Sequence, residues 1–297
     1  MPRTFYIETP DHFSFAQTIR SHGWNDLLPF ELDRENQTLR CVLTGENGEN
    51  PLSAVVKEAS GKLEIEVSGE NLDERKIIKD VRHILRLDDD LSDFYRLVER
   101  EKSLAWIAER NAGRLLRSPT VYEDLVKTVC TTNCSWALTK KMTTNLVEKL
   151  GKPAADGRRA FPTAAAMAGV SAEFYREEIR AGYRAAYFAE LAESVASGRV
   201  NPEAWLNSEL PAKDLKREMK KVKGVGDYAA DNLLKLVGSY EGLALDSWVR
   251  SQFYRKHNGA AVCADSQIES FYDRFGEWRG LVAWCDVTEK WFSDAGF

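Results

Sequence analysis

The chain has no apolar run of about eighteen residues, so the sequence predicts no membrane-spanning helix. Its first residues, Met-Pro-Arg-Thr-Phe-Tyr, also lack the basic-then-apolar pattern of a signal peptide. These two absences favour a cytoplasmic protein with no membrane partner.

Cysteine and histidine are scarce as well, with five and four copies. The cysteines are scattered and odd in number, and no Cys-x-x-Cys pair occurs, which argues against a disulfide framework, an iron–sulfur cluster or a zinc site. We expect buried free thiols, and the histidines indicate no metal site. These residues are Cys41, Cys130, Cys134, Cys263 and Cys285, and His12, His22, His83 and His257.

Positive charge is not in excess overall, since the net charge is −5. This value argues against indiscriminate binding of nucleic acid, but it leaves binding on one face open, because the location of the charge matters. Residues 213–223 hold six lysines and arginines against Asp214 and Glu218. The run is either the solvated face of a helix or a phosphate-contacting segment.

The patterns that are present predict an α+β fold. A small antiparallel β-sheet subdomain over residues 1–74 precedes a large all-helical body over 75–297, and residues 213–237 are expected to form a helical hairpin within that body. The expected strands are 39–43, 53–58 and 62–67, with turns at 45–51 and 60–61. The expected helices begin near Glu74 and include 91–100, 121–130, 136–150, 163–167, 172–179, 187–197, 213–219 and 229–237, with a loop at 151–159.

The hairpin carries the most informative motif, Gly224-Val225-Gly226. Glycines let the backbone turn sharply and approach another molecule, and Asp227 is a suitable N-cap for the next helix. The free N–H groups of such a terminus suit a phosphate. An ordinary helical hairpin turn is the alternative. Asp246 follows twenty residues after Gly226, at a distance that would serve an enzyme acting next to a bound phosphate.

Several further segments, taken with the hairpin, resemble the helix-hairpin-helix DNA glycosylases (HhH-GPD superfamily), nearest to 8-oxoguanine DNA glycosylase and 3-methyladenine DNA glycosylase II. The resemblance covers most of residues 75–292. The segments that carry it are Val81–Tyr95, Cys130–Asn133, Phe161–Thr163, Gly182–Tyr187 and Phe275–Gly280.

This resemblance implies an enzyme of base excision repair that rotates a damaged base out of double-stranded DNA. The resemblance makes Tyr183 the wedge that stacks against the remaining bases and Asn133 the plug that fills the vacated space. It makes Arg184 a hydrogen-bond donor to the orphaned base, the one left without its pairing partner. The alternatives are helix packing for Tyr183 and a helix cap for Asn133. The expected backbone contacts come from Lys221, Lys223, Gly224, Val225 and Gly226.

Asp246 matches the catalytic aspartate of the family. A carboxylate beside the sugar would stabilise an oxocarbenium-like transition state and orient the attacking water. The residue also fits an N-cap of a helix over 247–255, and the two roles are compatible.

Tyr228 stands where the oxoguanine enzymes have a lysine that forms a Schiff base. A phenol cannot form an imine, and Lys221 and Lys223 lie on the wrong side of the turn to replace the lysine. The sequence therefore predicts a monofunctional glycosylase. A bifunctional glycosylase/lyase and a non-catalytic DNA-structure-binding protein remain the alternatives.

Other departures leave the lesion, oxidised or alkylated and most simply a purine, undetermined. No glycine stands at His12, where the oxoguanine enzymes present a carbonyl to the base; Leu138 replaces one arginine that reads the opposite cytosine; and Ala283 lies where a polar pocket group is expected. The expected base pocket is built from Trp248, Trp284, Val287 and Phe13.

The partner implied is double-stranded DNA containing a damaged base, bound by a monomer that is associated with the nucleoid if the protein is bacterial. No cofactor is expected, although a structural monovalent cation at the hairpin stays open. The tryptophans of the pocket have ordinary core packing as their alternative.

Overall fold

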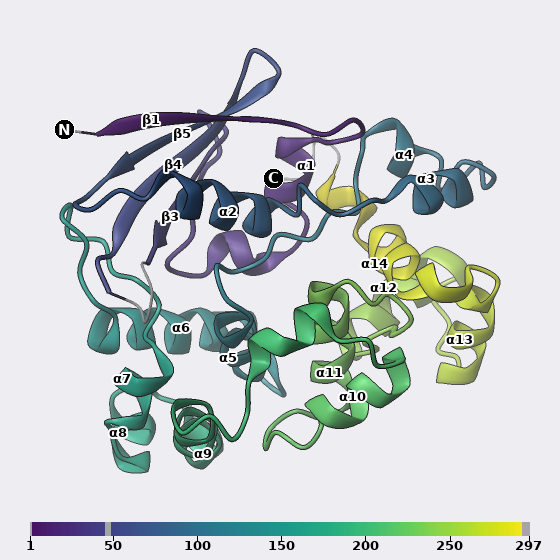
Figure 1. Cartoon of the computed structure of the whole chain (residues 1–297). Helices are drawn as coiled ribbons and strands as arrows, with labels where there is room; N and C mark the ends of the chain where they lie inside the picture. The colour runs from purple at the N-terminus through teal and green to yellow at the C-terminus, as the bar shows by residue number, and fades with distance from the viewer. Residues whose placement is uncertain (1, 45–48, 293–297) are drawn as a thin grey trace.

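A computed structural model describes residues 2–44 and 49–292 of the chain. A small antiparallel sheet precedes a larger helical body, as the sequence predicts (Figure 1). Met1, residues 293–297 and residues 45–48 of the expected turn at 45–51 lie outside the described residues. None of the helices in the described part combines the length and apolar character needed to span a bilayer.

The sheet has five strands in the order β1-β5-β4-β3-β2. The three expected strands are confirmed, whereas the first and second were missed because one pairs with a distant partner and the other has three residues. The strands are β1 Arg3–Glu8, β2 Glu31–Asp33, β3 Thr38–Leu43, β4 Leu52–Ala59 and β5 Lys62–Ser68.

The tight turn between β4 and β5 sets the register of the sheet. Ala59 pairs with Lys62, and the two residues between them, Ser60 and Gly61, have φ values of 53° and 77°. Two consecutive left-handed residues make the turn whose twist suits a two-residue hairpin. The expected turn at 60–61 is therefore confirmed.

The helical body follows the expected pattern, with ends shifted by a few residues. The expected loop over 151–159 is confirmed, with one isolated bridge between Pro153 and Arg159. The helices are α1 Phe15–Ile19, α2 Glu74–Leu85, α3 Ser92–Val98, α4 Trp106–Glu109, α5 Val121–Thr131, α6 Trp136–Leu150, α7 Ala164–Ala168, α8 Ala172–Glu177, α9 Ala185–Ala196, α10 Ala212–Met219, α11 Asp227–Val237, α12 Ser247–His257, α13 Asp265–Asp273 and α14 Arg279–Thr288.

Two large hydrophobic clusters hold these elements together. The first joins the sheet to α1–α4 and to the C-terminal helices α12–α14. The second is formed by α5–α11. In Figure 1 the sheet lies at the upper left, α5–α9 lie below it, and α10–α14 lie at the lower right. The division of the chain at residue 74 stays a proposal, and the first cluster contains residues from both sides of it.

The cysteines are free, as expected. Cys41, Cys130 and Cys285 are buried, while Cys134 and Cys263 are half-buried. Burial raises the pKa of the Cys41 and Cys130 thiols to about 12, so both stay protonated at neutral pH.

Candidate active site

The turn between α10 and α11 is tightly wound. The Val222 N–H donates to the Met219 carbonyl at 3.1 Å, and the Val225 N–H donates to the Val222 carbonyl at 3.0 Å. Gly224 has a φ of +90°, and a Cβ there would come within 2.9 Å of the Tyr187 ring. This position therefore needs glycine for both its conformation and its space.

The start of α11 corrects one expectation. Gly226, not Asp227, occupies the N-cap, and no side chain caps the helix. Asp227 is the first helical residue, and its carboxylate pairs with Lys220 at 2.8 Å and with Lys216 at 3.3 Å. A Cβ on Gly226 would meet nothing within 4 Å. The first-turn N–H groups of α11 thus have no side-chain cap.

The basic run before the turn is less positive than its sequence suggests. Lys221 pairs with Glu218 at 2.7 Å, and Lys223 pairs with Glu190 at 2.8 Å. Glu190 comes from α9, so this pairing depends on the tertiary fold. Both lysines are exposed and remain able to exchange their carboxylate partner for a phosphate.

The expected wedge and plug lie together. Tyr183 is 54% exposed, and its hydroxyl lies 3.5 Å from the carbonyl oxygen of Thr132, the neighbour of Asn133. Asn133 is exposed with a φ of 46°, and Ser135 rather than Asn133 caps α6.

Arg184 has a different place from the one expected. Its side chain is 2% exposed and donates hydrogen bonds to the Thr132 carbonyl and, at 3.3 Å, to the Thr132 hydroxyl. Its guanidinium also lies 4.5 Å from the centre of the Tyr183 ring. An arginine held in this way supports the wedge and the plug loop and is not open to a base.

A cavity of about 500 Å³ lies where the two hydrophobic clusters meet. Its volume falls within the range of ligand pockets. The expected pocket residues Trp248 and Trp284 line it, and so do three tryptophans that the sequence did not point to. Those three are Trp24, Trp136 and Trp291.

Two other expected pocket residues do not line the cavity. Phe13 packs half-buried against the first cluster, and Val287 is buried within α14. The face of α14 that reaches the cavity is instead that of Trp284, whose indole N–H donates to the Ser21 carbonyl at 2.9 Å. Phe13 and Val287 therefore lie outside the lining of this cavity.

The N-terminal contribution to the cavity comes from Arg20, residues 22–26 and Arg34 rather than from the segment around His12. Burial lowers the pKa of His22 to about 4, so its ring is neutral and Nε2 donates to the Leu116 carbonyl at 2.7 Å. Among the described residues, no cluster of three or more His, Cys, Asp or Glu could hold a metal ion.

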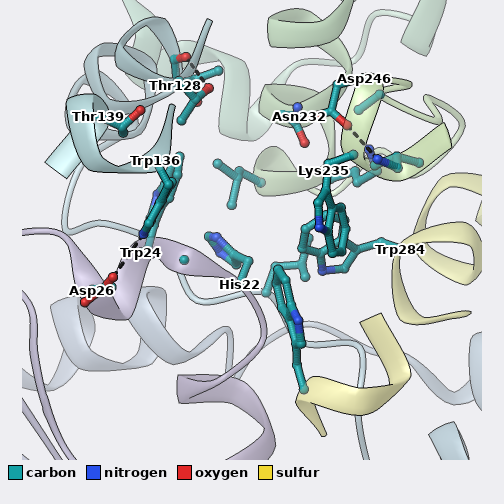
Figure 2. A pocket seen from close by; sticks show the side chains of 18 of the residues that line it. His22, Trp24, Asp26, Thr128, Trp136, Thr139, Asn232, Lys235, Asp246 and Trp284 are labelled. Carbon is teal, nitrogen blue, oxygen red and sulfur yellow. Dashed lines mark hydrogen bonds between the residues drawn. The ribbon is translucent and has the colours of Figure 1, made fainter. Parts of the chain in front are cut away.

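Two tryptophans of the cavity are held by hydrogen bonds from their indole N–H groups, and Figure 2 shows the one between Trp136 and Asp26. The Trp24 indole N–H donates to Asp124 Oδ1 at 2.6 Å. The Trp136 indole N–H donates to Asp26 Oδ2 at 3.0 Å, and its ring packs on Gly23, where a Cβ would come within 2.4 Å.

Asp246 lies at the cavity wall, at the N-cap of α12 (Figure 2). Its Oδ1 accepts the Val249 N–H at 2.7 Å, so the expected cap is confirmed. The half-buried carboxylate also lines the cavity, and the helix N-terminus favours its negative charge. Capping holds one oxygen and orients the side chain.

One face of α11 completes the cavity with Tyr228, Asn232 and Lys235. Their spacing of four and three residues places them on one side of a helix. Burial, with the charge of Asp246, raises the pKa of Tyr228 to about 12, so the phenol keeps its proton.

Lys235 is a further cavity residue that the sequence interpretation missed. It is 2% exposed, and its Nζ lies 3.5 Å from the Asp231 carbonyl. The Asp231 carboxylate pairs with Lys216, at 2.6 Å, and no ion pair joins Lys235 to a carboxylate within residues 2–44 and 49–292. Burial lowers the pKa of Lys235 to about 8. Its position two helical turns after Tyr228 was the feature of the sequence that could have placed it on the same face of the helix.

Replacing this amine tests how strongly its burial opposes folding. Lys235→Met is expected to raise the free energy of unfolding at pH 7 by up to about 3 kcal/mol. The unfolded lysine has a pKa near 10.5 and the folded one near 8, so the penalty is full below pH 8 and disappears as the pH rises toward 10.5. Urea unfolding of the wild type and of Lys235→Met at pH 7 and pH 10 measures this penalty. A difference in the free energy of unfolding that is the same at both pH values would contradict its assignment to the buried ammonium.

The sequence matches no protein-family model and no curated protein. Solved structures do match. A 3-methyladenine DNA glycosylase from Archaeoglobus fulgidus has a TM-score of 0.77 at 18% identity, over 98% of this chain and 99% of that chain. The apo form of the Clostridium acetobutylicum 8-oxoguanine glycosylase/lyase has a TM-score of 0.76 at 18% identity, over 99% and 98%.

The chain has the fold of these DNA glycosylases. A complex of the Clostridium acetobutylicum 8-oxoguanine glycosylase/lyase with double-stranded DNA containing cytosine opposite 8-oxoguanine also matches, with a TM-score of 0.65 at 21% identity over 89% of this chain and 98% of that chain. The matches to the first two structures cover nearly the whole chain, so the shared fold includes the N-terminal sheet and the last helices.

Proposed function

We propose that the protein is a monofunctional DNA glycosylase of base excision repair. It extrudes a damaged base into the tryptophan-lined cavity and hydrolyses the N-glycosidic bond. One observation carries the proposal: the oriented carboxylate of Asp246 lines a cavity of about 500 Å³ that Tyr228 in the first turn of α11 also lines, and no side chain caps that helix. The fold of the DNA glycosylases supports the same assignment.

Asp246 would act on the deoxyribose. Departure of the base leaves positive charge on the sugar, which a nearby carboxylate stabilises. With Oδ1 held by the Val249 N–H, Oδ2 is the oxygen available to the sugar or to the attacking water. The indole walls would stack on the base and exclude water from its faces.

The DNA would be held on both sides of this carboxylate. Backbone amides at the start of α11, flanked by Lys221 and Lys223, would bind phosphate. Tyr183 and Asn133 would fill the space left by the base, and Arg184 would fix their loop through Thr132. A pure DNA-structure-binding protein would have no need of Asp246 or of a gap filler.

Water is proposed as the nucleophile because Tyr228 presents a protonated phenol at the position of the lyase lysine. Lys235 is an amine in the same cavity, so the lyase alternative is tested through it.

The protein is proposed to act as a monomer. A monovalent cation at the hairpin would be held by backbone carbonyl oxygens of residues 219–225. Two of these oxygens, those of Met219 and Val222, each accept a backbone hydrogen bond within the turn.

The test is a panel of duplexes carrying oxidised, alkylated, deaminated or mismatched bases. We expect base release seen as strand breaks only after alkali, and no borohydride-trapped adduct. Breaks without alkali, together with an adduct, would establish the lyase alternative. Binding without release from any duplex would leave the non-catalytic alternative.

The phosphate-binding role of the turn can be separated from its folding role. Gly226→Val places methyl groups in open space with an ordinary φ of −91°, so the protein should fold and lose affinity for damaged and undamaged duplexes alike, roughly tenfold. Fluorescence anisotropy with both duplexes measures the effect. Weakened binding of one lesion alone would remove the turn from this role. Gly224→Val, by contrast, should destabilise the fold, since its φ is +90°.

A further inference from the structure

The side chain of Lys235 is not explained by the needs of the fold. It is 2% exposed, lines the tryptophan cavity and forms no ion pair within the described residues. Burying an ammonium without a carboxylate partner opposes folding. A methionine would fill the same place without that cost, so the amine at this position points to a ligand.

Its position along α11 indicates which part of a ligand it meets. Lys235 lies two turns beyond Tyr228, about 10 Å further from the hairpin turn. The turn is where the DNA backbone is proposed to lie, so a group two turns deeper faces the extruded base rather than the sugar. In the view of Figure 2, Lys235 comes between Asp246 and Trp284.

Resting on the glycosylase function proposed above, we propose that Lys235 Nζ donates a hydrogen bond to an acceptor on the extruded base. The enzyme thereby prefers neutral, carbonyl-bearing purines over positively charged alkylated purines.

The chemistry of hydrolysis gives this hydrogen bond a purpose. The bond between C1′ and the base nitrogen breaks, its electron pair leaves with the base, and the water oxygen bonds to C1′. The proton lost by that water ends on the base when the base was neutral, and passes to solvent when the base was cationic. A neutral base departs as an anion, which an ammonium donor stabilises. A base that is already cationic departs as a neutral molecule and gains nothing from the donor.

Three electrostatic effects act on a cationic base. The faces of the cavity tryptophans and the carboxylate of Asp246 attract cations. The ammonium of Lys235 repels them, and repulsion between two full charges is stronger than attraction to a ring quadrupole. Because the carboxylate is proposed to face the sugar and Lys235 to face the base, the ammonium should disfavour a cationic base while Lys235 is protonated.

Single-turnover base release from duplexes containing 8-oxoguanine, hypoxanthine or 7-methylguanine tests the proposal. The first two bases are neutral and carry carbonyls, and the third is cationic. For Lys235→Met we expect release of at least one neutral base to fall about 100-fold, while release of 7-methylguanine is unchanged or rises. Lys149→Met removes an exposed lysine paired with Glu178 outside the cavity, and it should match the wild type.

The outcomes separate the two proposals. Equal losses for all three bases, or no loss, would overturn the assignment of Lys235 alone. A borohydride-trapped adduct that depends on Lys235 would overturn this assignment and would also establish the lyase alternative. If the wild-type protein released 7-methylguanine but neither of the two neutral bases, the assignment of Lys235 would also be overturned. Release of none of the three bases, nor of any base in the wider panel, would overturn the glycosylase function and this role with it. Affinity for a duplex with an abasic-site analogue should be equal in both variants, because that ligand has no base to contact.

Discussion

Asp246→Asn is expected to lower the rate of base release roughly 1,000-fold while duplex affinity stays within about threefold of the wild type. The substitution removes the negative charge that would stabilise the sugar cation. It retains an oxygen that can accept the Val249 N–H, now bonded at 2.7 Å to Oδ1, because asparagine caps helices about as well as aspartate. Single-turnover release and anisotropy with the same duplex measure both quantities.

A matched variant distinguishes this effect from a general loss of structure. Asp265→Asn makes the same change at the first residue of α13, where the carboxylate pairs with Arg250 at 2.7 Å outside the cavity. That variant should keep its activity. Turnover by Asp246→Asn at more than a tenth of the wild-type rate would remove Asp246 from catalysis. Asp246→Ala is less informative, since it also loses the cap, at about 1 kcal/mol.

Arg86→Met is expected to lower the free energy of unfolding by about 3–5 kcal/mol. Arg86 is 1% exposed and donates to Asp89 Oδ2 at 2.7 Å, to the Lys235 carbonyl at 2.9 Å and to the Tyr240 hydroxyl. Burial acts to raise the pKa of Asp89, but Arg86 and Arg117 outweigh it and hold that pKa below its usual value. Removing the guanidinium would leave the half-buried carboxylate of Asp89 and the Lys235 carbonyl short of partners.

The control for this variant lies one turn earlier on the same helix. Arg82 pairs with Asp88, whose side chain is 65% exposed, so Arg82→Met should change the free energy of unfolding by no more than about 0.5 kcal/mol. Urea denaturation of the three proteins gives the comparison. A loss below 1 kcal/mol for Arg86→Met would mean that its buried hydrogen bonds contribute little. Since Arg86 holds the end of α11, the position of Lys235 also depends on it.

The elements with strong local patterns were predictable. The hairpin of β4 and β5, the helix α11 and the cap of α12 by Asp246 each follow from residues within a few positions of one another. The strand β1 was not, because its partner β5 lies some sixty residues away in the chain. Local preference says little about such a pairing.

The candidate site divides along the same line. Asp246, Tyr228 and the glycine turn are short-range motifs, and the chain order alone indicated them. The walls of the cavity do not come from short-range motifs. The Trp24 indole is held by Asp124 in α5, and the Trp136 ring packs on Gly23. These contacts join segments about one hundred residues apart, which no local periodicity encodes.

Neighbouring residues in the chain thus determined the α+β class, the hairpin and the carboxylate that follows it. Packing between distant segments decided which side chains surround that carboxylate: it excluded Phe13 and Val287, buried Arg184 and turned Lys235 into the cavity. The physical reason is that helix and turn formation depend on backbone and side-chain preferences within one or two turns, whereas a pocket wall depends on which faces of separate helices meet.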